Sequence, residues 1–177
     1  MLDYISLKAD LQVSKFIEPL YIKSFPLDEQ VPFDILKNQA LKPISDLIAV
    51  FDHKIFIGLL SLVYFEDIVF IWYLAIEESK RNLGYGSKIL QEIQSKYEDR
   101  RIILNIEECL NDKDKLKRKA FYLKNGFKEC AYKTMEYGVR YEMLYSHGFV
   151  TYEEYARMMI NYSGIEVFNA IYRKVEE

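Results

Sequence analysis

The chain has 177 residues, of which 50% are hydrophobic and 15% aromatic, and its formal net charge is −3. This length fits one globular domain with a sizeable core, and the composition excludes an intrinsically disordered chain. The mixed charges give no general attraction to nucleic acid or to anionic membranes, so we expect neither as a partner.

The few cysteines and histidines limit the disulfides and metal sites that can be expected. Cys109 and Cys130 can form one disulfide at most, while His53 and His147 stand outside any Cys/His cluster, so we expect no metal site. The first residues lack the pattern of a secretory signal, and no apolar run approaches the length of a membrane span. We therefore expect a cytoplasmic protein with reduced thiols.

Apolar periodicity predicts the elements of the first half of the chain. Ser14 is the expected N-cap of the first helix, and Pro19 inside that helix indicates a break or a late start. The predicted elements are a strand at 4–8, helices at 14–24 and 32–39, and strands at 47–51, 55–65 and 68–76. The last three strands would form an antiparallel meander.

The second half continues with alternating helices and strands. A helix is expected to open at Gly84 or Gly86 and to run to Tyr97, and Asn125-Gly126 is a helix stop signal. The predicted elements are a strand at 102–106, a basic helix at 113–124, and strands at 127–132 and 139–145.

The last thirty residues differ from the rest. Thr151 with Glu154, and Ser163 with Glu166, both match the capping-box spacing, and each pair precedes apolar residues at helical intervals. We expect two short amphipathic helices at 151–162 and 164–174. They are too short to be stable alone in water, so they should pack on the domain or on a second subunit, which leaves a homodimer open.

The stretch Arg81-Asn82-Leu83-Gly84-Tyr85-Gly86 lies between a strand-like run and a helix-like run. Glycine lets a ligand approach the backbone closely, and free N–H groups at a helix N-terminus favour phosphate. The alternative is a plain turn that happens to contain two glycines.

A second segment, Phe121-Tyr122-Leu123-Lys124-Asn125-Gly126-Phe127, follows about forty residues later. The two segments, in this order and spacing, resemble the GNAT superfamily of acetyl-CoA-dependent N-acetyltransferases. The resemblance covers residues 1–145 and leaves 146–177 as a helical extension. It implies an α/β fold with a mixed, twisted sheet flanked by four helices, to which the extension adds two more.

The resemblance also implies how acetyl-CoA is held. Backbone N–H groups of residues 82–88 would bind the pyrophosphate, and the pantetheine arm would pair with residues 73–76, where the fourth and fifth strands of the family splay apart. Lys115 stands where many members have an asparagine that contacts CoA, so that contact is in doubt. The expected cofactor-binding residues are Leu74, Ala75, Ile76, Arg81, Asn82, Leu83, Gly84, Tyr85, Gly86, Ser87 and Arg118.

Tyr122 matches the family tyrosine that protonates or hydrogen-bonds the departing thiolate, although a core tyrosine on an amphipathic helix is the alternative. A base must also take the proton of the amine. Glu107 is the first choice, with its neighbour Glu108 expected to face solvent, and Glu77 and Glu78 are the other candidates. The acceptor pocket is expected to be lined by Phe25, Glu29, Tyr73, Tyr132, Tyr137 and Tyr141.

These patterns together predict transfer of acetyl from acetyl-CoA to a primary amine of a small molecule or peptide. Direct attack would form a tetrahedral intermediate that backbone N–H groups near residues 74–76 stabilise. One alternative is a catalytically silent acyl-CoA-binding regulatory protein of the same fold. Another, a dinucleotide-binding unit, would need a third glycine in the loop and strand–helix alternation from the start, and the sequence has neither.

Overall fold

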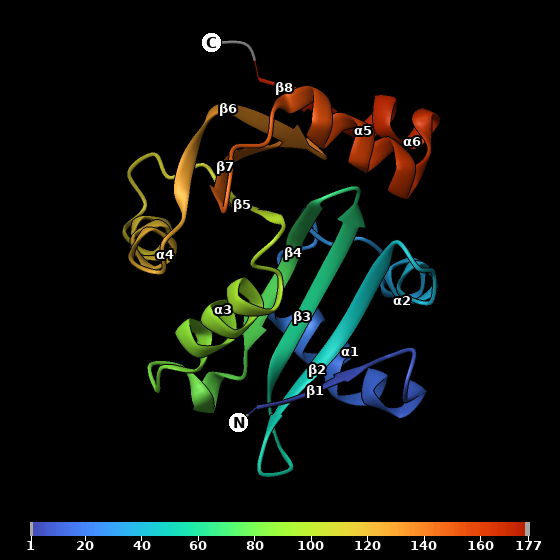
Figure 1. Cartoon of the computed structure of the whole chain (residues 1–177), viewed down its shortest axis with the longest axis vertical. Coiled ribbons are helices and arrows are strands. Elements are labelled where there is room, and N and C mark those ends of the chain that lie inside the picture. The colour runs from blue at the N-terminus through green and yellow to red at the C-terminus, as the bar shows by residue number, and fades with distance from the viewer. Residues whose placement is uncertain (1, 176–177) are drawn as a thin grey trace. The chain divides into compact units, whose positions relative to one another are not determined.

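The computed structural model describes residues 2–175, which divide into two compact units. The first unit holds the residues up to Tyr64 together with Ile71–Ile93. The second holds Phe65–Phe70 and the residues from Gln94 onward. The division falls within strand β4 (Ile68–Ile76). Figure 1 labels the helices and strands along the chain.

The first unit is built on an antiparallel arrangement of neighbouring strands. Their order is β1-β2-β3-β4, and β2 pairs with both β1 and β3 in antiparallel register. The predicted bounds of β3 and β4 are confirmed to the residue, whereas β1 starts and ends earlier than predicted and β2 is longer. The strands are β1 (Asp3–Ser6), β2 (Ser45–Asp52), β3 (Ile55–Phe65) and β4.

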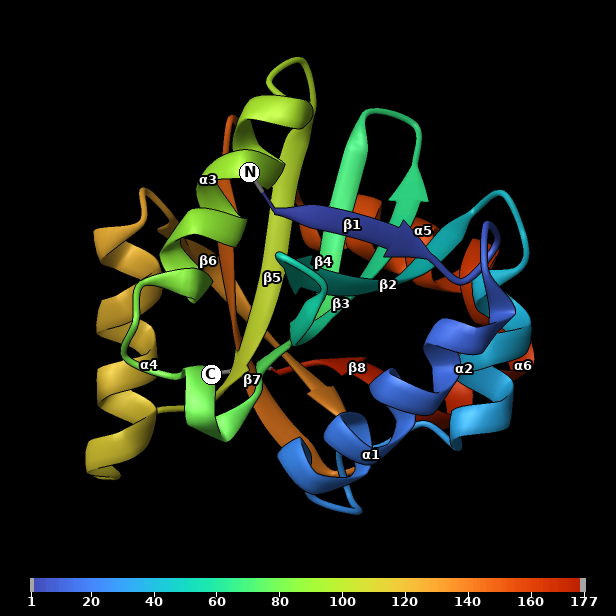
Figure 2. The ribbon, with the colours of Figure 1, turned by 90° about the horizontal axis from the view of Figure 1, so that it is seen from below.

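Three α-helices belong to the first unit: α1 (Ser14–Ser24), α2 (Phe33–Ala40) and α3 (Tyr85–Lys96). On β2, Phe51 meets Phe16 of α1 with ring centroids 5.5 Å apart. Tyr4, opposite Val50, donates a hydrogen bond to Glu92 of α3 at 2.8 Å. Because successive residues of a strand point to opposite faces, α1 and α3 cover opposite faces of these strands (Figure 2).

The start of α1 differs from the prediction. A 3₁₀ turn, η1 (Leu11–Val13), leads directly into the helix, so Val13 is the N-cap and the Ser14 hydroxyl donates back to the Leu11 carbonyl oxygen at 2.8 Å. Ser14 as N-cap was therefore wrong. Pro19 lies inside α1 without breaking it. A proline removes only one backbone hydrogen bond, and the buried Ile17, Leu20 and Tyr21 hold the helix on the core.

The second unit combines strands with three further α-helices. Its strand order is β5-β7-β6-β8, and the three pairs are antiparallel. The stop signal at Asn125-Gly126 is confirmed, since Gly126 has φ +88° directly after α4. The elements are β5 (Arg101–Glu107), α4 (Lys113–Lys124), β6 (Lys128–Glu136), β7 (Val139–Ser146), α5 (Tyr152–Ser163), α6 (Ile165–Ile171) and β8 (Tyr172–Lys174).

The tail contains both predicted helices, and Figure 1 shows them beside β6 and β8. The predicted end of the second helix at residue 174 was wrong, because α6 ends at Ile171 and residues 172–174 form β8. The capping box at Thr151 is confirmed: its hydroxyl accepts from the N–H of Glu154 while the Glu154 carboxylate accepts from the N–H of Thr151. The second box is wrong, because the Ser163 hydroxyl donates to the Met159 carbonyl oxygen and Gly164 precedes α6. The strand β8, which pairs with the edge of β6, was not predicted.

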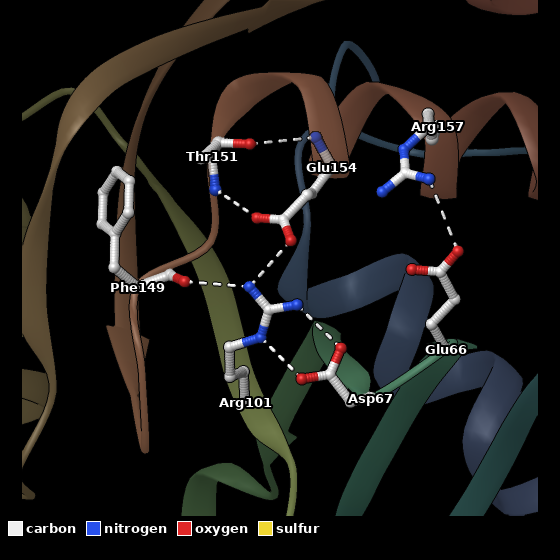
Figure 3. Close-up of polar contacts among 7 residues, drawn as sticks. All are labelled: Glu66, Asp67, Arg101, Phe149, Thr151, Glu154 and Arg157. Carbon is white, nitrogen blue, oxygen red and sulfur yellow. Dashed lines mark hydrogen bonds and ion pairs between the residues drawn. The ribbon is translucent and has the colours of Figure 1, made fainter.

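Arg101 on β5 joins three segments of the second unit (Figure 3). Its guanidinium donates two hydrogen bonds of 2.7 Å to the Asp67 carboxylate in the turn before β4, and a third of 3.0 Å to the Phe149 carbonyl oxygen. It also pairs with Glu154 of α5 at 2.9 Å. Hydrogen bonding from Arg101 lowers the pKa of Asp67, and the backbone N–H of Thr151 together with Arg101 lowers the pKa of Glu154.

We expect Arg101→Met to lower the free energy of unfolding by about 2–4 kcal/mol, since several charge-assisted hydrogen bonds are lost at a partly buried site. The two carboxylates have lowered pKa values in the folded state, so their stabilisation is present at neutral pH and is lost progressively as the pH falls below about 4. Denaturant unfolding at pH 7 and pH 3 measures both effects. The neighbouring Arg100→Met is the control. An equal loss of unfolding free energy at pH 7 and at pH 3 would contradict this account.

Candidate active site

The loop between β4 and α3 has a defined conformation. A 3₁₀ turn, η2 (Glu78–Lys80), follows β4, and Arg81 then donates from Nε to the Ile76 carbonyl oxygen at 3.1 Å. Asn82 and Gly84 have φ of +62° and +83°, a region that glycine adopts without strain. Arg81 thus holds the loop to the end of β4. This local structural contact is separate from any contact of Arg81 with phosphate.

The backbone N–H groups of residues 82–87 have no hydrogen-bond acceptor among the residues that the structure describes. The first bonded N–H of the helix is that of Lys88, which donates to the Gly84 carbonyl oxygen at 3.0 Å. A side chain added at Gly84 would meet no atom within 4 Å. Consecutive free donors beside open space at a helix N-terminus form a site that suits a phosphate or pyrophosphate.

Tyr85 attaches the first turn of α3 to the strands of the first unit. Its hydroxyl donates to the Asp52 carboxylate at the end of β2 at 2.9 Å. This hydrogen bond lowers the pKa of Asp52 and raises that of Tyr85. The loop is therefore held at both ends, by Arg81 and by Tyr85, while its middle is exposed. Such preorganised donors lose little entropy when they bind an anion.

The expected cofactor strand residues lie at the end of β4. Ala75 is buried, whereas Leu74 and Ile76 are half-buried. The backbones of β3 and β4 approach closely here, because a Cβ at Gly58 would lie 2.2 Å from the Ala75 carbonyl oxygen.

Three of the expected acceptor residues come together in the first unit. The rings of Phe25 and Tyr73 lie edge-to-face with centroids 4.8 Å apart. The Tyr73 hydroxyl donates to the Glu29 carbonyl oxygen at 2.9 Å, and the Gln30 side chain donates to the carbonyl oxygens of Ile22 and Phe25. The segment between α1 and α2 is thus fixed by side-chain hydrogen bonds, and its half-buried Phe25 packs on the buried Tyr73.

The other three expected acceptor residues lie in the second unit. Tyr132 is buried and packs edge-to-face on Phe149 and Tyr152, both close to the tail. Tyr141 is buried on β7 opposite Glu107, and Tyr137 is 47% exposed in the turn between β6 and β7.

Tyr122 lies on α4 in the second unit. Its half-buried ring meets Phe121 and Phe127 edge-to-face, with centroids 5.2 and 6.0 Å away. Its hydroxyl has no recorded hydrogen-bond partner in the described part of the chain. Burial raises the pKa of Tyr122 to about 12, partly offset by Arg118. The phenol is therefore protonated at neutral pH and can donate a hydrogen bond or a proton to a ligand.

Both carboxylates at the end of β5 are ion-paired. Glu107 lies 2.7 Å from Lys115 and 3.9 Å from the exposed Arg118, both on α4. Glu108 pairs with Lys133 and Arg140 of β6 and β7, each at 2.8 Å, and its side chain is only 11% exposed. The two side chains point to different elements, as strand alternation predicts, but the expectation that Glu108 faces solvent was wrong because these two cations bury it.

Glu77 and Glu78 differ from that pair. Glu77 directly follows β4, with its N–H bonded to the Ile57 carbonyl oxygen, and Glu78 forms an exposed ion pair with Lys23 at 2.7 Å. The lowered pKa of Glu78 follows from this hydrogen bond with Lys23, which makes it a weak base.

The sequence analysis missed a buried polar cluster in the second unit. Glu136 at the end of β6 is only 5% exposed, and its Oε1 accepts hydrogen bonds from Tyr155 of α5 at 2.7 Å and from Asn105 of β5 at 2.9 Å. Burial raises the pKa of Tyr155 well above its usual range. The only sequence signal was an acidic residue at a strand end that also carries apolar neighbours.

Three features of the described residues bear on cofactors and environment. No group of three or more His, Cys, Asp or Glu side chains there could hold a metal ion. Cys109 and Cys130 are free thiols, so they form no disulfide. No helix between residues 2 and 175 combines the length and the apolar character needed to cross a bilayer.

These features define a class of protein. It has an α/β fold and a loop at a helix N-terminus that suits a phosphate. Residues 45–129 match the family model described as the acetyltransferase (GNAT) domain, so this stretch of the chain is a GNAT acetyltransferase domain. The resemblance drawn from the two sequence segments is confirmed. No curated protein matches the sequence.

Solved structures with the same fold include three informative neighbours. A protein from Bacteroides thetaiotaomicron assigned to the GNAT acetyltransferases has a TM-score of 0.76 at 23% identity, over 93% of this chain and 99% of that one. The spermidine/spermine N-acetyltransferase SpeG from Vibrio cholerae has 0.62 at 18%, over 82% and 91%. The ribosomal-protein-S18-alanine N-acetyltransferase from Escherichia coli has 0.63 at 14%, over 86% and 97%. The predicted fold class is confirmed, and the domain match with these neighbours supports an N-acetyltransferase.

Proposed function

We propose that the protein transfers the acetyl group of acetyl-CoA to a primary amine of a small molecule or peptide by direct attack. The observation that carries the proposal is the loop before α3, whose consecutive backbone N–H groups at residues 82–87 have no acceptor in the described chain. These groups would hold the pyrophosphate, with Arg81 shaping the loop, and Arg118 would meet a phosphate of CoA.

The chemical roles proposed for the remaining residues follow from what each group can do. Tyr122, neutral at physiological pH, would give a proton to the departing thiolate. Glu107 would take the proton of the amine. To do so, its carboxylate has to break the ion pair with Lys115 or accept the proton while that pair is in place. Backbone N–H groups near residues 74–76 would stabilise the oxyanion. The half-buried ring of Phe25, packed on Tyr73, supports an acceptor site in the first unit.

The organisation that we propose is an acetyltransferase domain at residues 1–145 with a helical extension at 146–177, working in the cytoplasm without a metal ion. The acceptor is best sought with a panel of amines and detection of the free CoA thiol. Polyamines and a peptide with an amino-terminal alanine belong in the panel, because two of the similar structures are enzymes named for such acceptors. CoA binding without turnover on any amine would favour the catalytically silent alternative.

We expect Gly84→Val to weaken acetyl-CoA binding at least about tenfold, which corresponds to about 1.4 kcal/mol. A β-branched side chain at φ +83° distorts the loop and fills the open space beside its N–H groups. Calorimetric titration with CoA measures the effect. Gly164→Val is the matched control, since Gly164 has φ +88° and the same empty surroundings but lies between α5 and α6. Unchanged affinity in the Gly84 variant would refute the loop as the pyrophosphate site.

A further inference from the structure

An amine of the chain itself lies beside the proposed base. Lys115 Nζ is 2.7 Å from Glu107 Oε1, and the two side chains are 30% and 18% exposed. Arg118 is the other cation near Glu107, but its guanidinium is 3.9 Å away and is not a nucleophile at neutral pH. Lys115 is thus the one amine in residues 2–175 recorded within hydrogen-bond reach of Glu107.

Lys115 also shares a helix face with Tyr122. The half-buried residues of α4 are Lys115, Lys119, Phe121 and Tyr122, of which Lys115, Lys119 and Tyr122 recur at intervals of four and three. The other residues of the helix are exposed. The two positions are separated by two helical turns, or about 10 Å along the axis. One face of α4 therefore presents a neutral phenol and two amines with carboxylate partners. Of these amines, Lys115 is the one paired with Glu107, whereas Lys119 lies between Glu129 and Glu142.

This arrangement has the groups that acetyl transfer needs. An amine must lose a proton before it attacks a thioester, and a general base works from a heavy-atom distance of about 2.6–3.2 Å. Lys115 and Glu107 meet that condition without any added acceptor. Lys117, on the same helix, is also paired with a carboxylate, Asp114, at 3.0 Å, but its side chain is 78% exposed and lies off this face.

We propose that Lys115 is an intramolecular acetyl acceptor, so that the protein modifies itself when it binds acetyl-CoA. The inference rests on the proposed function. The Lys115 ammonium gives one proton to Glu107, and the neutral nitrogen bonds to the acetyl carbon to form a tetrahedral intermediate, whose carbon–sulfur bond then breaks. The nitrogen then loses a second proton to water, and Glu107 releases the first one to water. The thiolate takes a proton from Tyr122, which water restores. The products are N-acetyl-Lys115, the free CoA thiol and one proton.

Acetylation would alter the site that performs it. The amide of acetyl-lysine is neutral, so Glu107 would lose its nearest cation and keep only the longer contact with Arg118. An acetylated chain therefore differs from the parent in the charge that faces the proposed base.

The experiment incubates the full chain with acetyl-CoA and follows the modification of each lysine by peptide mass spectrometry. We expect Lys115 to be acetylated at least about tenfold faster than Lys117, because a positioned amine reacts at high effective molarity. The rate constant should not depend on protein concentration, since donor-loaded chains react with themselves. Tyr122→Phe and Glu107→Gln should slow the reaction at Lys115 and leave that at Lys117 unchanged.

Two variants complete the design. Lys115→Arg keeps the positive charge beside Glu107 and should abolish the fast modification, while the matched control Lys117→Arg should keep it. A Lys115 that stays unmodified, or one that reacts no faster than Lys117 or equally in Tyr122→Phe, would overturn the proposal. Thiol release with the amine panel shows whether the proposed function fails with it, since turnover of an added amine beside an unmodified Lys115 would refute self-acetylation alone.

Discussion

Turnover of the Tyr122→Phe enzyme on a true acceptor is expected to be about a hundredfold to ten-thousandfold slower, the usual effect of a positioned acid. The substitution keeps the ring contacts with Phe121 and Phe127 and removes only the hydroxyl, which has no recorded partner in the described residues. The folded protein should therefore keep its stability and its affinity for CoA. Steady-state kinetics by thiol release and calorimetric titration with CoA separate the two effects.

The control for this variant is Tyr145→Phe, another half-buried tyrosine of the second unit, whose ring packs on Phe149. It should turn over like the parent. Parent-like turnover in the Tyr122 variant would mean that water or another group protonates the thiolate. A loss of CoA affinity equal to the loss of turnover would instead indicate a binding role for the hydroxyl.

The second large effect concerns stability. Gly58→Ala is expected to lower the free energy of unfolding by about 3 kcal/mol or more, at or above the upper end of overpacking effects. The added Cβ would lie 2.2 Å from the Ala75 carbonyl oxygen, so a backbone strand and not a flexible side chain has to move. The displaced strand end is the one proposed to stabilise the oxyanion, so any protein that folds should also lose turnover. Thermal and denaturant unfolding measure the first effect.

Gly138→Ala provides the comparison for Gly58→Ala. Gly138 has φ +87° in the turn between β6 and β7, and a Cβ there would meet no atom within 4 Å. That variant carries only backbone strain, about 1–2 kcal/mol. If Gly58→Ala has the melting temperature of the parent, or is less destabilised than Gly138→Ala, the close approach of β3 and β4 at Gly58 is refuted.

The elements that sequence predicted well are those fixed by local signals. β3 and β4 are long apolar runs bounded by short polar turns, and both match to the residue. α4 has a stop at Asn125-Gly126 and an N-cap at Asp112, whose carboxylate accepts from two N–H groups. β8 has only three residues and no alternation to detect, so its strand conformation comes from pairing with β6.

The same contrast holds for the site. The loop of residues 81–86 was predictable because its chemistry belongs to consecutive backbone groups. The ion pairs of Glu107 and Glu108 were not, because their cations come from a helix and from two other strands. Ser163 matches the capping pattern, yet Gly164 at φ +88° separates α5 from α6. The Ser163 hydroxyl therefore bonds to the last turn of α5 and does not cap α6. Sequence spacing alone does not distinguish these outcomes.

The pairing of β8 with β6 bears on the order in which the chain folds during synthesis. Tyr172 is buried and opposes Glu136, so the edge of the second unit is completed by residues close to the last ones that the structure describes. Domains form from the amino terminus as the chain is made, and the last residue assigned to the first unit is Ile93. The second unit has to wait until residue 174 has emerged from the ribosome, and until then the end of β6 is an open strand edge that chaperones or other nascent chains can bind.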